Sequence, residues 1–299
     1  MYQQISANKR KTALMVLAFV LLLGAVGFAF NFLLQGGWVG LAIVAVIVIA
    51  SSVTSYMNSD KIALRMSRAV PADPVEYARY HNLVEGLCIA SGLPKPDLYV
   101  IDDPAPNAFA TGRSPKHASI AVTTGLLEKM NRVELEGVLA HELSHVRNYD
   151  VLVMTIAVTM VGIIVLASEF FLRMMFWTGR GRNSEANNPL GPIFAAVGFA
   201  LLIFAPIIAR MMQFAVSRNR EYLADVSGVQ MTRYPPGLIS ALKKLDADQT
   251  AVHSSSKATA HLWIEEPLDK ESEKGTSKFN RMFSTHPPIH ERIRALESL

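Results

Sequence analysis

Three side chains that could do chemistry stand within one short stretch, His141-Glu142-Leu143-Ser144-His145. Residues four apart lie on the same face of a helix, so the two imidazoles could bind one Zn²⁺ at about 2.0–2.1 Å each. Glu142 is displaced by one position and could take a proton from a water instead of binding the metal. Because zinc brings the pKa of such a water to about 7, the pattern predicts metal-assisted hydrolysis at neutral pH.

Apolar neighbours of this motif indicate a buried helix: Val138, Leu139, Ala140, Leu143 and Val146. Unpaired histidines and a glutamate would be costly in such a helix if they had no function, because burying polar groups without partners costs free energy. The alternative interpretation is an amphipathic helix with two surface histidines.

A second pair of residues with helical spacing is Glu221 and Asp225. A catalytic zinc usually has three protein ligands and a water, so Glu221 could be the third ligand. Asp225, one turn further on, could accept a hydrogen bond from a ligand histidine and fix its tautomer. The alternative is an acidic helix surface with arginines beside it, such as Arg218 and Arg220.

Two further stretches leave their function open. The small residues of Asn107-Ala108-Phe109-Ala110-Thr111-Gly112 suit an exposed sheet edge close to a ligand backbone, and a plain loop fits the spacing equally well. His286 precedes two prolines, which holds it in an extended conformation. It could donate a hydrogen bond to an oxyanion, but on the sequence alone a surface histidine is the simpler interpretation.

The composition indicates a membrane protein. The chain of 299 residues is 51% hydrophobic and 18% charged, with a mean hydropathy of +0.25, which exceeds the apolar content of an ordinary soluble protein. Four apolar runs account for this content: residues 12–34, 38–56, 151–172 and 192–212. The last two could cross the membrane or only embed partly. Basic residues flank the first hairpin on both sides, which predicts cytosolic flanks.

Charge and cysteine content exclude other classes. The net charge is +4, but no cluster of Lys and Arg interleaved with aromatics occurs, so we expect no nucleic-acid partner. The single cysteine, Cys88, excludes a disulfide framework and indicates a reducing compartment. Cys88 lies in an apolar helical run and is interpreted as a core residue.

The elements that must position the motifs are predicted as an α+β fold that is mostly α, with a small β-sheet. We expect a helix from Asp73-Pro74 to about Ser91, a helix with the metal motif capped by Asn131, and a final helix after Pro288. Short strands are expected at residues 97–101, 108–110 and 119–123. Two more helices are expected at residues 236–245 and 257–262, before a charged segment at 265–278.

The motifs occur in one order along the whole chain: two apolar runs, Asn107 to Gly112, the His141 to His145 motif, an apolar hairpin, Glu221-x-x-x-Asp225 and Thr285-His286-Pro287-Pro288. In this combination the chain resembles the HtpX family of bacterial membrane zinc proteases, which are gluzincins related to the CAAX prenyl endopeptidases. The resemblance implies a multi-pass enzyme of the bacterial inner membrane with a cytosolic zincin-type protease domain and N-terminus. Its expected substrates are unfolded or damaged membrane proteins, cleaved in quality control under stress.

The resemblance also implies roles for particular residues. The implied ligands of one Zn²⁺ per chain are His141, His145 and Glu221. Glu142 resembles the general base, Asp225 the partner of a ligand histidine, and His286 the residue that steadies the tetrahedral intermediate. The residues that resemble the substrate-binding edge are Asn107, Ala108 and Phe109.

This interpretation divides the chain into four parts: an N-terminal transmembrane hairpin (1–59), the first half of the protease domain with the metal motif (60–150), a second apolar hairpin (151–212), and the second half of the protease domain with the third ligand (213–299). Three alternatives share some of these features. They are a CAAX-type endopeptidase acting on prenylated proteins, a non-catalytic zinc-binding membrane scaffold, and a transporter, which the few intramembrane charges disfavour.

Overall fold

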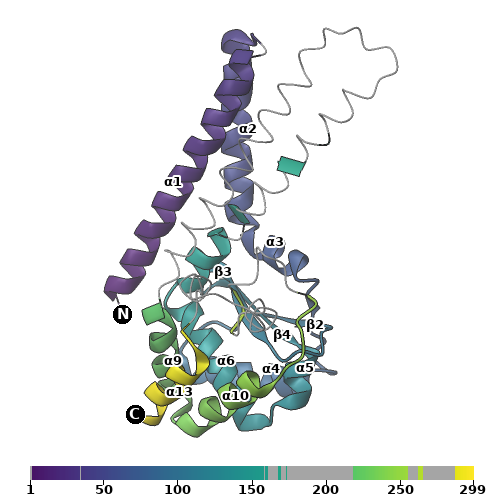
Figure 1. The fold of residues 1–299 in the computed structure, drawn as a ribbon, viewed down its shortest axis with the longest axis vertical. Helices are drawn as coiled ribbons and strands as arrows, with labels where there is room; N and C mark the ends of the chain where they lie inside the picture. The colour runs from purple at the N-terminus through teal and green to yellow at the C-terminus, as the bar shows by residue number, and fades with distance from the viewer. Residues whose placement is uncertain are drawn as a thin grey trace.

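The computed structural model describes residues 2–33, 35–157, 159–160, 168–169, 173, 218–254, 262–264 and 287–299. In the described residues, two long N-terminal helices extend from a domain in which further helices pack against a small sheet (Figure 1). The fold is therefore mostly helical with a mixed sheet, as predicted.

The N-terminal helices are α1 (Tyr2–Leu33) and α2 (Gly37–Met57), joined by a tight turn (Figure 1). Among the described residues, two segments are long and apolar enough to cross a membrane, Ile5–Phe28 within α1 and the whole of α2. The second coincides with the predicted run at 38–56, and the first overlaps the predicted run at 12–34 but begins earlier. On α2, Trp38 is 88% exposed and Val39 73% exposed, so this helix presents an apolar surface that the described part of the chain does not cover.

The sheet contains β1 (Val70–Pro71), β2 (Asp97–Ile101), β3 (Ala108–Ser114) and β4 (His117–Thr123), in the order β1-β2-β4-β3. The β2–β4 pair is parallel and the other two pairs are antiparallel. The prediction for β2 is confirmed, while β3 and β4 are longer than predicted and form a hairpin. Gly112 in β3 has a φ of +142°, and a Cβ there would lie 2.3 Å from the carbonyl oxygen of His117, so only glycine fits this close approach.

Seven more helices are labelled in the described residues: α3 (Ser59–Met66), α4 (Ala78–Ser91), α5 (Thr124–Lys129), α6 (Arg132–Arg147), α9 (Arg218–Thr232), α10 (Pro235–Ala247) and α13 (Ile289–Glu297). Four of the predicted helices are found in this set. One start is wrong: α4 begins at Ala78 rather than at Asp73-Pro74. The reason is that the Asp73 side chain accepts hydrogen bonds from the N–H groups of Val75 and Glu76 and holds a turn there.

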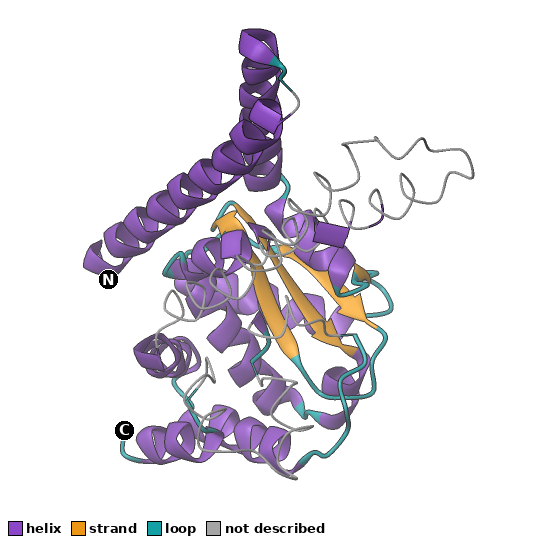
Figure 2. Ribbon diagram, turned by 45° about the horizontal axis from the view of Figure 1, so that its top comes forward, coloured by secondary structure: helices purple, strands orange, loops and turns teal. Residues whose placement is uncertain are grey.

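Helix α6 packs against β3 of the sheet and against helices α9 and α10. Figure 2 shows helices lying against the orange strands of the sheet. Its start is a complete capping box: the Asn131 side chain accepts from the Glu134 N–H, and Glu134 accepts from the Asn131 N–H. Gly137 allows α10 to approach, because a Cβ there would lie 2.8 Å from the backbone nitrogen of Leu238. The start of α6 is thus capped, and the helix packs closely against α10 from its second turn.

The third apolar run is described only at its start. Residues 150–157 are helical and follow α6 after Tyr149, which has a φ of 60°. Leu152 and Ile156 pack with Met15 and Phe19 of α1 in a separate apolar cluster. The rest of this run, the whole fourth run, most of the predicted helix at 257–262 and the charged segment at 265–278 lie outside the described residues.

Candidate metal centre

Helix α6 places the two motif histidines side by side in the interior. His141 is fully buried and His145 is 5% exposed. Their rings are nearly perpendicular, with centroids 4.7 Å apart, and their Nε2 atoms are 3.2 Å apart. The two Nε2 atoms are close enough to bind one metal ion, because residues four apart lie on the same face of a helix.

Helix α9 supplies the carboxylate that faces this pair. Glu221 Oε2 lies 3.6 Å from His141 Nε2, and Glu221 Oε1 lies 3.6 Å from His145 Nε2. Gly228 makes the contact between α6 and α9 possible, because a Cβ at this position would lie 3.0 Å from the backbone nitrogen of His141. The three side chains are buried and come from two helices that are far apart in the chain.

The spacing of these three groups fits a metal ion. For bonds of 2.0–2.1 Å, neighbouring ligands of a tetrahedral zinc lie about 3.3–3.4 Å apart. The separations here are 3.2 Å between the histidines and 3.6 Å from each histidine to Glu221. Two neutral imidazoles and one carboxylate also form a ligand set typical of a catalytic rather than a structural zinc, because the fourth position is left for a water or substrate.

The other nitrogen of each ring faces a carboxylate. His141 Nδ1 lies 2.9 Å from Asp225 Oδ1, and His145 Nδ1 lies 3.3 Å from Asp150 Oδ2. With the Nδ1 atoms acting as donors, both Nε2 atoms keep lone pairs that can bind a metal. Asp225 therefore lies where the sequence predicted it, whereas Asp150 was not predicted.

Two more residues that the sequence analysis missed support these carboxylates. The buried guanidinium of Arg292 donates to both oxygens of Asp225, at 2.8 and 2.6 Å. Its Nη1 lies 3.7 Å from Glu221 Oε2. On the opposite side, Asn8 of α1 donates to Asp150 Oδ1 at 2.8 Å and to the Asn148 carbonyl at 3.0 Å. The N-terminal helix is thus connected to His145 through one carboxylate.

These contacts shift the pKa values of the site. Burial opposes ionisation of Asp225, but the Arg292 guanidinium outweighs it and lowers the pKa of Asp225 to about 2. Burial and Arg292 disfavour a charged His141, but the Asp225 and Glu221 carboxylates raise its pKa to about 9. For Glu142, which is 1% exposed, burial raises the pKa above its usual value. A carboxyl with a raised pKa is better suited to proton transfer near neutral pH.

The predicted substrate edge is only partly as expected. β3 is an edge strand, but the expectation that its start is exposed is wrong: Asn107, Ala108 and Phe109 are at most 1% exposed. The cause is a later segment of the chain. The Ile264 N–H donates to the Ala108 carbonyl at 2.9 Å, and the Trp263 ring packs edge-on against Phe109 with centroids 4.9 Å apart. The other predicted catalytic residue, His286, lies outside the described residues.

A buried site of two histidines and one glutamate, on helices packed against a small sheet, defines the class of metallopeptidases. Residues 74–299 match the model of peptidase family M48, and the chain belongs to this family. It is 45% identical to a protease HtpX homolog from Caldanaerobacter subterraneus subsp. tengcongensis, over 100% of this chain and 98% of the relative. It is 42% identical to a protease HtpX homolog from Streptococcus uberis, over 100% of both chains. These relatives confirm the predicted resemblance, and the protein is a metalloendopeptidase.

A solved structure shares the fold. The crystal structure of S. mikatae Ste24p matches 99% of this chain and 67% of its own chain, with a TM-score of 0.51 and 17% sequence identity. At this identity the match concerns the arrangement of the elements alone.

Proposed function

We propose that this protein is a membrane-anchored zinc endopeptidase that cleaves unfolded or damaged membrane proteins on the cytosolic side of the bacterial inner membrane. The observation that carries the proposal is the convergence of His141, His145 and Glu221, whose ligand atoms lie within 4.8 Å of one another. The choice of zinc rests on the ligand set and on the near-tetrahedral spacing.

In the proposed mechanism, His141, His145 and Glu221 hold the metal, and Asp225 and Asp150 keep both rings in the tautomer that binds it. When bound, zinc supplies a Lewis acid that polarises the scissile carbonyl and makes a water more acidic. Glu142 accepts the proton of the attacking water and donates it to the leaving nitrogen. His286 is proposed to donate a hydrogen bond to the oxyanion.

The membrane part of the proposal is supported by α1 and α2. A long helix with many exposed apolar side chains is unfavourable in water and is typical of a membrane or protein contact. Lys9, Arg10 and Lys11 precede the apolar part of α1, and Lys61 and Arg65 follow α2, which favours a cytosolic location for both flanks. We propose that residues 1–59 form a transmembrane hairpin, that 60–150 and 213–299 form the cytosolic protease domain, and that the hairpin at 151–212 adds two further apolar helices.

Substrate recognition is proposed to occur by strand addition at β3, beside α6. A substrate that pairs with Ala108 in the same way as Ile264 would have to displace residues 262–264 first. Strand addition requires an extended backbone, so unfolded segments would be cleaved in preference to folded ones. The substrate edge would then consist of Asn107, Ala108 and Phe109.

The experiment that tests the function compares Glu142→Gln with the wild type in cleavage of an unfolded protein. The full-length enzyme is purified, loaded with zinc and reconstituted in lipid. We expect the variant to retain one zinc per chain and to lose about 10²- to 10⁴-fold in rate, because general-base catalysis contributes about that much. Glu136→Gln, on the same helix but away from the ligands, is the matched control.

Cleavage by Glu142→Gln at the wild-type rate would refute the base assignment. Absence of cleavage by the zinc-loaded wild type would instead favour a non-catalytic scaffold. A prenylated peptide, tested in parallel with the same peptide without the prenyl group, distinguishes a CAAX-type specificity.

A further inference from the structure

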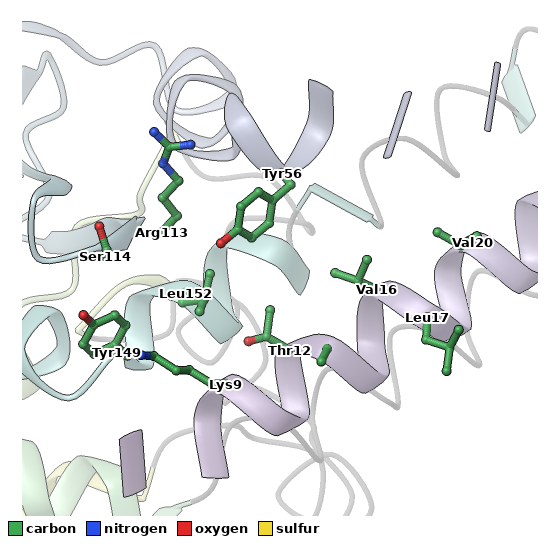
Figure 3. A pocket seen from close by; sticks show the side chains of 11 residues that line it. Lys9, Thr12, Val16, Leu17, Val20, Tyr56, Arg113, Ser114, Tyr149 and Leu152 are labelled. Atoms are coloured by element: carbon green, nitrogen blue, oxygen red, sulfur yellow. The ribbon is translucent and has the colours of Figure 1, made fainter. Parts of the chain in front are cut away.

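A pocket of about 730 Å³ lies between α1, the C-terminal end of α2, the end of β3 and the segment that follows α6 (Figure 3). None of its lining residues is one of the proposed metal ligands. Its volume is in the range of small-molecule sites. The pocket therefore has to be explained separately from the metal centre.

One end of the pocket is positively charged. Lys9 Nζ lies 4.9 Å from the centre of the Tyr149 ring, and the Arg113 guanidinium donates to the Met57 sulfur at 2.7 Å, which is a weak acceptor. Within the described part of the chain, neither cation pairs with a carboxylate, and no lining residue is acidic. Figure 3 shows the Lys9 side chain reaching toward Tyr149, while Arg113 lies across the space from them with its guanidinium turned away. This end is suited to an anion.

Thr12 adds a buried donor to the same end. Thr12 is only 5% exposed, yet its Oγ1 makes no hydrogen bond with any of the described residues. A threonine in a helix can usually bond to the carbonyl one turn before it, so a buried hydroxyl without that bond is unusual. Figure 3 shows the Thr12 side chain facing the space beside Leu152. A ligand oxygen in the pocket would satisfy this hydroxyl.

The other end of the pocket is apolar. Val16, Leu17 and Val20 continue along α1 away from Lys9 (Figure 3). From Lys9 to Val20 the helix rises by about 16 Å, so the pocket changes from cationic to apolar along the axis of the candidate span Ile5–Phe28. Polar headgroups and hydrocarbon follow each other in the same order across one leaflet of a bilayer.

We infer that this pocket is a binding site for an anionic phospholipid. Lys9 binds the phosphate and the Thr12 hydroxyl donates to one of its ester oxygens. Arg113 adds positive charge from across the space, and an acyl chain lies along Val16 and Val20. A soluble anion would leave the apolar end unused, and a purely apolar peptide segment would leave two cations and a buried hydroxyl without partners. The inference rests on the proposed insertion of α1 in the membrane.

The position of the site gives the lipid a functional consequence. Asn8, Lys9 and Thr12 lie within about one turn of α1, and Asn8 donates to Asp150, the carboxylate beside His145. A lipid held between α1 and Leu152 would therefore keep α1 docked against the segment that supports a metal ligand.

The test is native mass spectrometry of the full-length protein, released from membranes that contain equal amounts of phosphatidylglycerol and phosphatidylcholine. We expect one retained phosphatidylglycerol per chain. Each basic residue near an anionic lipid contributes about 1 kcal/mol, or about fivefold in affinity, so Lys9→Gln combined with Arg113→Gln should weaken retention about 30-fold. Thr12→Val, which keeps the side-chain shape, should weaken it about two- to tenfold.

The matched control is Lys61→Gln combined with Arg65→Gln, which removes the same charge from the exposed face of α3, outside the pocket. Equal losses in both double variants would overturn the inference, because general surface charge would then explain the binding. Equal retention of the two lipids would also overturn it and would favour an apolar peptide as occupant. Flotation with phosphatidylcholine vesicles separates the two proposals: a protein that does not float refutes membrane insertion, whereas one that floats but shows no lipid preference refutes only the lipid site.

Discussion

The support that Asp150 gives to His145 can be removed by a single substitution, Asp150→Asn. In the structure, one carboxylate oxygen accepts from Asn8 at 2.8 Å, and the other lies 3.3 Å from His145 Nδ1. An amide has only one acceptor oxygen. In the variant, either Asn8 or His145 therefore faces an NH₂ group, and the negative charge beside the ligand is lost.

The expected size of the effect follows from this geometry. Loss of a hydrogen-bonding partner of a ligand histidine typically lowers metal affinity 10- to 100-fold. The contact of 3.3 Å is longer than the 2.9 Å contact between His141 and Asp225, so we expect the lower limit, about tenfold, or about 1.4 kcal/mol. Asn8→Ala, which removes the donor to Asp150 but leaves the carboxylate, should cause a smaller loss.

The assay is competition for zinc between the full-length protein and a chelator of known affinity. The d–d spectrum of the cobalt-substituted enzyme reports on the geometry of the ligands in the same samples. Asp102→Asn is the matched control, because Asp102 is exposed and is not one of the carboxylates that face the two histidines. Zinc affinity unchanged in Asp150→Asn, or lowered equally in Asp102→Asn, would refute the reasoning.

Three further predictions concern the packing around the centre. Arg292→Met leaves the buried Asp225 carboxylate without its ion pair and should destabilise the metal-free protein by about 3–5 kcal/mol. Chemical denaturation measures this loss, with Arg294→Met as the control because the Arg294 side chain is exposed. Equal stability of the two variants would contradict the pairing. Gly228→Ala should separate α9 from α6 and lower both zinc affinity and melting temperature, and an unchanged affinity would show that α9 can shift freely. Burial opposes ionisation of Glu134, but hydrogen bonds from Lys244, Ser240 and the Asn131 N–H lower its pKa overall. Its contribution to stability is therefore present above the unfolded pKa of about 4.3 and is lost as the pH falls through the lower folded value. Glu134→Gln should flatten the loss of stability below pH 4.3, and an unaltered pH profile would exclude this role.

Local patterns were sufficient to predict the elements that carry the ligands. The spacing of four residues in α6 and in α9 placed His141 with His145 and Glu221 with Asp225, because each pair depends only on helix geometry. The helix cap at Asn131 and the bounds of β2 are equally local features. That α6 and α9 pack together, by contrast, followed from no spacing in the sequence, only from the resemblance and from the number of ligands that zinc requires.

The supporting residues could not be predicted in this way, because their partners are distant in the chain. Asn8 reaches Asp150 across 142 positions, and no periodicity relates the two. For Arg292 a signal was present: it lies on the same helix face as Ile289 and Leu296, so a charge on this apolar side of α13 required a buried partner. The covering of β3 by Ile264 had no comparable signal, because the return of a chain to a sheet edge depends on the whole fold.

The metal centre joins residues that are made at very different times during translation. Arg292 lies 151 positions after His141, and Glu221 follows the predicted apolar hairpin at residues 151–212. A ribosome that has completed α6 has therefore produced both histidines but neither the third ligand nor the guanidinium that holds Asp225. The newborn polypeptide therefore lacks part of the candidate metal centre during its synthesis, and the centre is complete only after α13 has docked.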